Sequence, residues 1–244
     1  MSTFFSNLDK QKFIMDEKLE DIKELLVKKS YTKQQISKIT KEVFEMFKKE
    51  LKSVQDYLSP QMREAAPLVE VKYYDKGDLE VHLKFSGDTL VFMMHTNIFD
   101  FDSSHIIHKN PYIKEDLMRS FCGMIQVYNF LSDSLKYNRE GDFGYLVGRI
   151  FINKDKHFFV EGKRPLSFLY HDIACCEINQ ETVRNIIKDS MNFCLNFDLI
   201  APPIDLLNNI SVEQKNLMSF SSGMPTAKRL GFQMSKDIDE FEEK

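Results

Sequence analysis

Residues 68–95 contain three short apolar segments separated by two turns, and this arrangement constrains the fold most strongly. In the middle segment, residues 79–85, apolar residues alternate strictly with Glu, His and Lys, so one face is apolar and the other polar. Turns this short can join only antiparallel strands, because parallel strands need a long crossover. The stretch therefore predicts a three-stranded antiparallel meander. The uniformly apolar third strand, 89–95, is expected at a central position or with both faces covered.

A second group of strands is expected further along the chain. Residues 144–153 and 157–162 form a predicted hairpin across a Lys-Asp-Lys turn, and residues 166–172 are a candidate for another strand. Residues 121–131 are apolar and ambiguous between helix and strand, and the hairpins around them favour a strand. Because no glycine-rich strand-to-helix turn is present, a nucleotide-binding parallel sheet is not expected. The predicted class is α+β, an antiparallel sheet of two hairpin or meander units flanked by helices.

The first sixty residues predict a helical hairpin. Residues 8–28 form one expected helix, and Thr32 with Gln35 has the spacing of a capping box at the start of a second helix. Pro60 and Pro67 are expected to end that helix. Its apolar residues recur at intervals of three and four: Ile36, Ile39, Val43, Phe47, Leu51, Val54 and Leu58. The stripe either packs on the chain's own core or mediates self-association or contact with a partner.

The pattern divides the chain into three parts. Residues 1–60 are the helical hairpin, residues 61–207 an α+β domain, and residues 208–244 a tail that is expected to be partly disordered. Within the domain, Asn179 is the expected cap of a final amphipathic helix.

Charge and cysteine usage limit the classes of function. The net charge of −4 argues against a general nucleic-acid coat protein. No apolar run is long enough to span a bilayer, and the first residues lack the features of a secretory signal. The four cysteines form no CxxC pair, and adjacent Cys175 and Cys176 are expected to be buried thiols. A cytoplasmic protein without membrane contact is expected.

The stretch "HTNIFDFDSSHIIH" is the candidate metal site. His95, Asp100, Asp102, His105 and His108 supply imidazole and carboxylate groups of the kind that bind zinc, manganese or iron. The interleaved Phe and Ile residues equally fit a polar loop that is attached to a core. Convergence of the five side chains would distinguish a divalent metal site from such a loop.

The predicted second hairpin carries the candidate catalytic residues. Glu161 and Lys163 have the form (D/E)xK, and Asp142 lies upstream near the start of the preceding strand. This pattern resembles the one with which magnesium-dependent nucleases bind their ion and stabilise charge on phosphate. The chain departs from it because no proline precedes Asp142, and because a strand rather than a helix is expected after the hairpin.

Two functions are therefore expected from the residues. The leading one is a non-enzymatic binding or regulatory protein, without a cofactor, that uses the helical hairpin for self-association or partner contact and the sheet as a ligand or protein surface. The alternative is a Mg- or Mn-dependent phosphodiesterase or nuclease that uses Asp142, Glu161 and Lys163. Nucleic acid is a partner only under this alternative.

Overall fold

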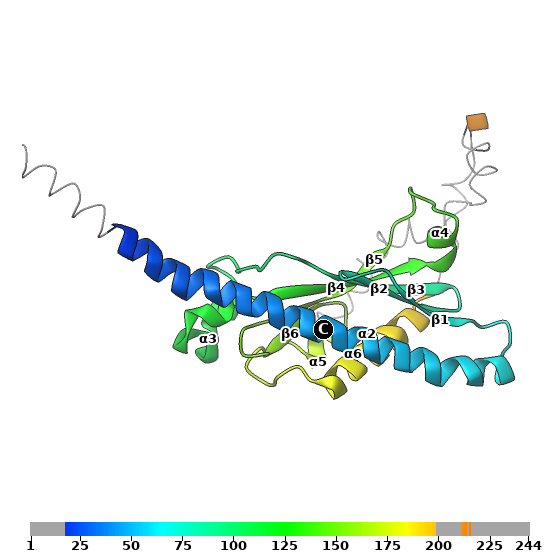
Figure 1. Cartoon of the computed structure of the whole chain (residues 1–244). Helices are drawn as coiled ribbons and strands as arrows, with labels where there is room; N and C mark the ends of the chain where they lie inside the picture. Colours follow the sequence, from blue (N-terminus) through cyan, green and yellow to red (C-terminus); the bar gives the residue numbers. More distant parts are fainter. Residues whose placement is uncertain (1–17, 199–210, 214, 216–244) are drawn as a thin grey trace, which may run out of the picture.

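The computed structural model describes residues 18–198, 211–213 and 215, and its centre is one antiparallel sheet (Figure 1). Six strands follow one another in the order of the sequence, each paired with the next. The strands are β1 (Val71–Asp75), β2 (Glu80–Phe85), β3 (Asp88–Met94), β4 (Gly123–Leu131), β5 (Tyr145–Ile152) and β6 (Phe158–Gly162). This meander with flanking helices confirms the predicted α+β class, and residues 121–131 form mostly strand, as favoured.

The central position expected for the third strand is also confirmed. β3 lies between β2 and β4, and Val91 stands opposite His82 on one side and Tyr128 on the other. Val91 and its neighbours Leu90 and Phe92 are all buried. Side chains on both faces of the strand are covered around Val91, which explains its apolar residues, although Met93 near its end is exposed.

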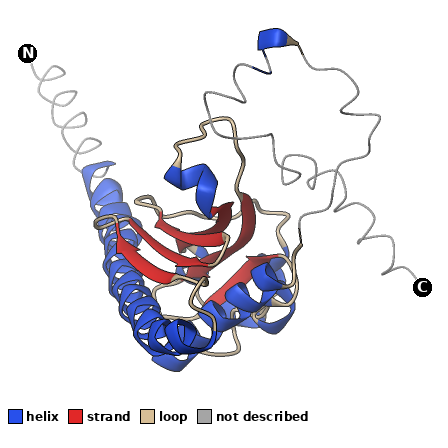
Figure 2. Ribbon diagram, turned by 90° about the vertical axis from the view of Figure 1, so that its right-hand side faces the viewer, coloured by secondary structure: helices blue, strands red, loops and turns tan. Residues whose placement is uncertain are grey.

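Two helices cover one face of the sheet (Figure 2). They are α2 (Tyr31–Ala65) and α6 (Gln180–Leu195). Asn179 caps the start of α6, and its side chain accepts a hydrogen bond from the Thr182 amide at 3.0 Å. One hydrophobic core joins both helices to the sheet. Its largest fully buried side chains include Phe44, Phe47, Leu51, Leu83, Leu90, Phe92, Ile125, Ile150 and Phe158.

The long helix crosses the sheet at a glycine. A Cβ atom on Gly123 of β4 would lie 1.9 Å from the Oγ1 atom of Thr40, so only glycine allows this approach. Thr40 is buried, and its hydroxyl donates to the Ile36 carbonyl at 2.8 Å. The helix axis can therefore lie close to the strand, which brings the apolar stripe of α2 into the core.

The predicted N-terminal helical hairpin is wrong for the residues that the structure describes. Residues 18–65 form one continuous helical run, with the π-helical segment η1 (Leu26–Ser30) where a turn was expected. Thr32 is not a cap: its hydroxyl donates to the Lys28 carbonyl at 2.6 Å, four residues back in the same helix. Pro60 lies inside α2 and does not end it.

Residues 166–172, a candidate strand, are also different in the structure. They contain the short helix α5 (Leu166–Leu169), which starts directly after Pro165. The following Tyr170 carbonyl accepts a hydrogen bond from the Val160 amide at 2.7 Å. The segment thus covers the outer edge of β6 without forming a strand, which protects that edge from pairing with another chain.

The cysteines differ from expectation in one respect. Cys122 and Cys194 are buried free thiols, whereas Cys175 and Cys176 are exposed. The adjacent pair lies in the loop before α6, which contacts the β5–β6 turn through the isolated bridge between His157 and Glu177 and through the hydrogen bond between His157 and the Ile173 carbonyl. Most of the predicted tail, residues 208–244, lies outside the described residues.

Candidate functional site

The candidate metal residues lie in the connection between β3 and β4, which folds over the second face of the sheet. This connection contains η2 (Ile106–Lys109), α3 (Pro111–Glu115) and η3 (Leu117–Ser120). Phe101 attaches it to the sheet, with ring centroids 5.0 Å from Phe151 and 5.6 Å from Phe159. A second hydrophobic cluster forms here, separate from the core under α2.

Three of the five candidate metal ligands hold the shape of this connection. His95 accepts a hydrogen bond at Nδ1 from the Asn97 amide at 3.0 Å. Asp100 accepts from the Ser120 hydroxyl at 2.8 Å. Asp102 accepts from the hydroxyl of Ser104 at 2.6 Å and from its amide at 2.9 Å, and these bonds lower the pKa of Asp102. Each of these side chains has a local partner.

The two remaining histidines point to different partners. His108 donates from Nε2 to the Phe101 carbonyl at 3.2 Å. His105 accepts at Nδ1 from the Ile107 amide at 3.3 Å, so its proton is on Nε2, from which it donates to Glu161 at 3.3 Å. In the described part of the chain, no three His, Cys, Asp or Glu side chains form a group that could hold a metal ion.

Glu161, a candidate catalytic residue, contacts His105, a candidate metal ligand. Its carboxylate already has two hydrogen-bond donors as partners. Arg149, directly opposite on β5, forms an ion pair with it, and His105 donates to its other oxygen. The three side chains are partly exposed at the edge of the β3–β4 connection. An ion at this position would have to displace Arg149 from the carboxylate.

The other two candidate catalytic residues lie elsewhere. Asp142 accepts a hydrogen bond at 2.6 Å from Ser134 of α4 (Ser132–Lys136), beyond the start of β5. The backbone amide of Lys163 donates to the Val147 carbonyl at 3.1 Å, just after β6. Arg149, which stands opposite Glu161 of β6, is four residues beyond Tyr145 in β5, about 13 Å along the strand. Within the described residues, no hydrogen bond or ion pair joins Asp142, Glu161 and Lys163 to one another, and their catalytic role stays a prediction.

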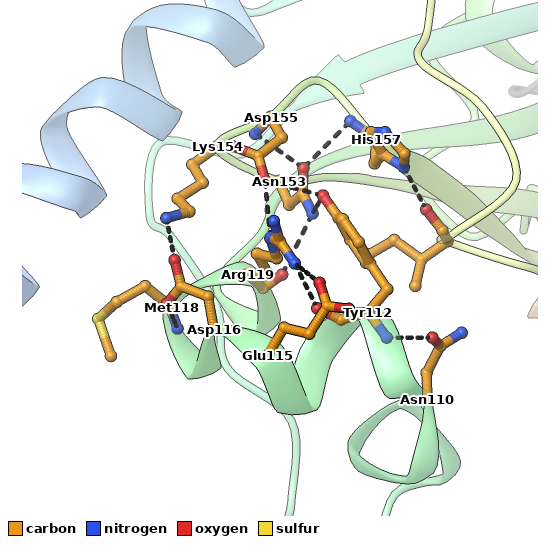
Figure 3. Close-up of polar contacts among 11 residues, drawn as sticks. Asn110, Tyr112, Glu115, Asp116, Met118, Arg119, Asn153, Lys154, Asp155 and His157 are labelled. Atoms are coloured by element: carbon orange, nitrogen blue, oxygen red, sulfur yellow. Dashed lines mark hydrogen bonds and ion pairs between the residues drawn. The ribbon is translucent and has the colours of Figure 1, made fainter.

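The densest polar network surrounds the turn between β5 and β6 (Figure 3). Asn153 is fully buried, and its Oδ1 accepts hydrogen bonds from the amides of Asp155 at 2.9 Å and His157 at 3.0 Å. Its Nδ2 donates to the hydroxyl of Tyr112 at 3.1 Å. One side chain therefore holds the turn and ties it to α3.

Asp155 extends the network towards the surface. Its carboxylate accepts from the Tyr112 hydroxyl and from Nε of Arg119, both at 2.9 Å. The Arg119 guanidinium lies 4.2 Å from the Tyr112 ring centroid and also donates to Glu115 at 2.9 Å. Burial raises the pKa of Tyr112 to about 12, so this hydroxyl stays protonated as a donor.

Sequence reasoning did not single out these residues, although one signal was present. Asn153 followed by Asp155 has the spacing of an Asx turn, in which a side-chain oxygen accepts from an amide two residues on. Nothing in the sequence indicates that Tyr112 and Arg119, from the distant connection, reach the same turn.

A groove lies between this turn and α2. Its volume is about 640 Å³. It is lined by Tyr31, Gln34, Gln35, Lys38, Ile39, Glu42, Lys154 and Asp155. Both acidic residues have cationic partners, because Glu42 lies 3.5 Å from Lys156 and Asp155 is bound by Arg119. The groove is lined by polar groups and by apolar surface, with the exposed ring of Tyr31 among them.

Comparison of the chain with protein-family models, curated proteins and solved structures found no match. Within the described residues, no helix has the length and apolar character needed to cross a membrane. The residues and their geometry are therefore the basis for the function proposed below.

Proposed function

We propose that this chain is a non-enzymatic binding protein that self-associates through the N-terminal part of its long helix, residues 18–30. The observation that carries the proposal is an apolar stripe on this segment, which extends beyond the body (Figure 1). Leu19, Ile22 and Leu26 are spaced by three and four, and 55%, 51% and 56% of their surface is exposed. In α2 the same kind of stripe is buried against the sheet.

The charge pattern of residues 18–30 favours a second copy of the chain as the binding partner of this segment. The half of the segment before Leu26 has three acidic residues, Glu20, Asp21 and Glu24, and two lysines, so its net charge is −1, and a basic stretch follows with Lys28 and Lys29 and, in α2, Lys33. In an antiparallel pair centred near Leu26, the acidic half of each helix lies opposite the basic half of the other. A parallel pair would bring like charges together.

The size of the stripe sets the strength expected for this contact. Two such helices, with their flanking polar residues, bury about 1,200 Å², which is at the lower limit of specific interfaces. A dissociation constant in the micromolar range follows, with exchange between monomer and dimer.

The open part of the second sheet face, where Tyr74 and Met93 are exposed, provides a further surface for a ligand or protein. The four free cysteines support a cytoplasmic location within this proposal.

Sedimentation equilibrium of the full chain tests the proposal. The wild type is expected to form dimers at tens of micromolar, and a variant with both Ile22→Glu and Leu26→Glu is expected to remain monomeric. Leu68→Glu is the matched control, because this leucine is 97% exposed but lies outside the segment, and it should dimerise like the wild type.

Thermal unfolding should be similar for all three proteins, since none of the changed residues belongs to the core. A wild type that stays monomeric at several hundred micromolar would refute self-association. A dimer that persists in the double variant would show that another surface is responsible.

A further inference from the structure

The groove between α2 and the β5–β6 turn has polar groups that lack partners. The phenol of Tyr31, the amides of Gln34 and Gln35 and the ammonium of Lys38 form no hydrogen bond or ion pair with any side chain in the described part of the protein. These groups are exposed and line one continuous groove. Together they offer donors for carboxylates and peptide carbonyls and an aromatic surface for an apolar side chain.

Basic residues lie on the helix beside the groove, and among them Lys38 lines it. Between Glu24 and Glu42 the helix carries no acidic residue but has Lys28, Lys29, Lys33, Lys38 and Lys41. None of these lysines forms an ion pair with another described residue. Across the groove, Lys154 is paired with Asp116, and its hydrogen bond lowers the pKa of that carboxyl group. The acidic residues of the groove are neutralised, as described above, so an anionic ligand is favoured.

The chain itself contains a segment of the complementary chemistry. Residues 236–244, Lys-Asp-Ile-Asp-Glu-Phe-Glu-Glu-Lys, have five acidic residues within seven positions and include Ile238 and Phe241. The last described residue of the body before this segment is Asp198, and the connecting residues 199–236 can reach up to about 3.3 Å each. That length exceeds what is needed to reach any point on the body. Tethering also raises the local concentration of the segment to about the millimolar range.

We propose that the acidic C-terminal segment, residues 236–244, binds in this groove of the same chain, with carboxylates on Lys38 and its neighbouring lysines and Phe241 against Tyr31 and Ile39. The inference does not depend on self-association, because Tyr31, Lys38 and Ile39, which line the groove, lie outside residues 18–30. Single-stranded nucleic acid is the other polyanion that an aromatic and basic groove could accept. The acidic overall charge of the protein and the tethered segment favour the peptide.

Carbodiimide cross-linking of the full-length protein, followed by peptide mapping, tests this binding. The reagent forms an amide bond between a carboxylate and a lysine amine that are in contact. Cross-links are expected from residues 237–243 to Lys38 and the other lysines of the groove, and they should weaken at high salt. A mixture of isotope-labelled and unlabelled protein distinguishes links within one chain from links between chains.

Matched variants make the result specific. Lys38→Glu should reduce the cross-links to the groove about fivefold, the effect of losing one partly solvated ion pair. Lys136→Glu, an exposed lysine of α4 at the opposite end of β4, should leave them unchanged. Binding of the segment should also slow hydrogen exchange of the backbone amides that line the groove. Lys38→Glu should weaken this protection, and changing Asp239 and Glu240 to lysine in the Lys38→Glu background should restore it.

Several results would overturn the proposal. Cross-links from the segment only to lysines outside the groove would do so, as would links that occur only between different chains. A yield that Lys38→Glu does not change, while circular dichroism shows a folded variant, would also refute it. Absent cross-links, together with binding of a labelled oligouridylate that Lys38→Glu abolishes, would assign the groove to nucleic acid.

Discussion

The contact between α2 and α6 allows a quantitative prediction, because it contains a buried carboxylate with a cationic partner. Only 2% of the Glu50 side chain is exposed. It accepts hydrogen bonds from Arg184 Nε at 2.8 Å and from Gln180 Nε2 at 2.5 Å. The substitution Arg184→Ala removes the counterion of Glu50 and leaves the charge of Glu50 in place.

The expected loss of stability is about 2 kcal/mol at neutral pH. Breaking a fully buried ion pair from one side costs about 3–5 kcal/mol, because an uncompensated charge is left behind. Arg184 is 48% exposed, so water screens part of the interaction, and Gln180 still donates to the carboxylate. For a chain of this size, 2 kcal/mol lowers the melting temperature by about 4–8 °C.

The pH dependence provides an independent check. The hydrogen bond from Arg184 lowers the pKa of Glu50 below its ordinary value in the folded protein. The stabilisation is therefore fully present above the pKa of the unfolded chain, near 4.5, and is lost as the pH falls through the folded pKa. The effect of Arg184→Ala should be large at pH 7 and should shrink towards acidic pH.

Urea unfolding followed by circular dichroism at pH 7 and pH 4 measures both effects. Glu50→Gln in the Arg184→Ala background should recover part of the loss, because it removes the unpaired charge. Lys52→Ala is the control: this lysine pairs with Asp56 at 3.2 Å on the exposed face of the same helix, and less than about 0.5 kcal/mol is expected. An Arg184→Ala effect no larger than that control, or the same at both pH values, would refute the reasoning.

Three further substitutions test the fold. Gly123→Ala should lower stability by about 1–3 kcal/mol, because its Cβ overlaps Thr40, and Thr40→Ala in the same chain should restore part of it in a thermal melt. Asn153→Ala should cost about 2–3 kcal/mol in urea unfolding, because two amides of the β5–β6 turn lose their acceptor. Phe101→Ala should release the β3–β4 connection, with faster proteolysis within it and a loss of about 2 kcal/mol, while unchanged cleavage would contradict its anchoring role.

The antiparallel sheet was predictable because its signals are local. Alternation of polar and apolar residues within β2 and the short turns beside it depend only on neighbouring residues, and they correctly predicted the meander. The same holds for Asn179, whose capping role follows from the residues just after it. The helical hairpin was wrong because a Ser-Tyr-Thr segment is compatible with both a turn and a continuing helix. In this chain Thr32 bonds back to Lys28 and the helix continues.

The candidate metal site shows what a local sequence pattern cannot predict. The sequence correctly indicated that His95, Asp100, Asp102, His105 and His108 occupy one irregular connection, but it contained no information on where each side chain points. In the structure their nearest partners are backbone and hydroxyl groups of the same connection, apart from His105, which reaches Glu161 on β6. That pairing depends on how the connection folds back over the sheet.

By itself, the sequence determined the first meander, the second hairpin, the amphipathic helices and the acidic end of the chain, since each depends on residues that are close together. Only the tertiary structure decided that Asn153 joins Tyr112, that Glu50 joins α2 to α6, and that a groove lies between α2 and the β5–β6 turn. Each of these contacts joins residues far apart in the chain. They form because burial of the apolar faces brings these elements together, and the polar side chains buried at the junctions need hydrogen-bond partners.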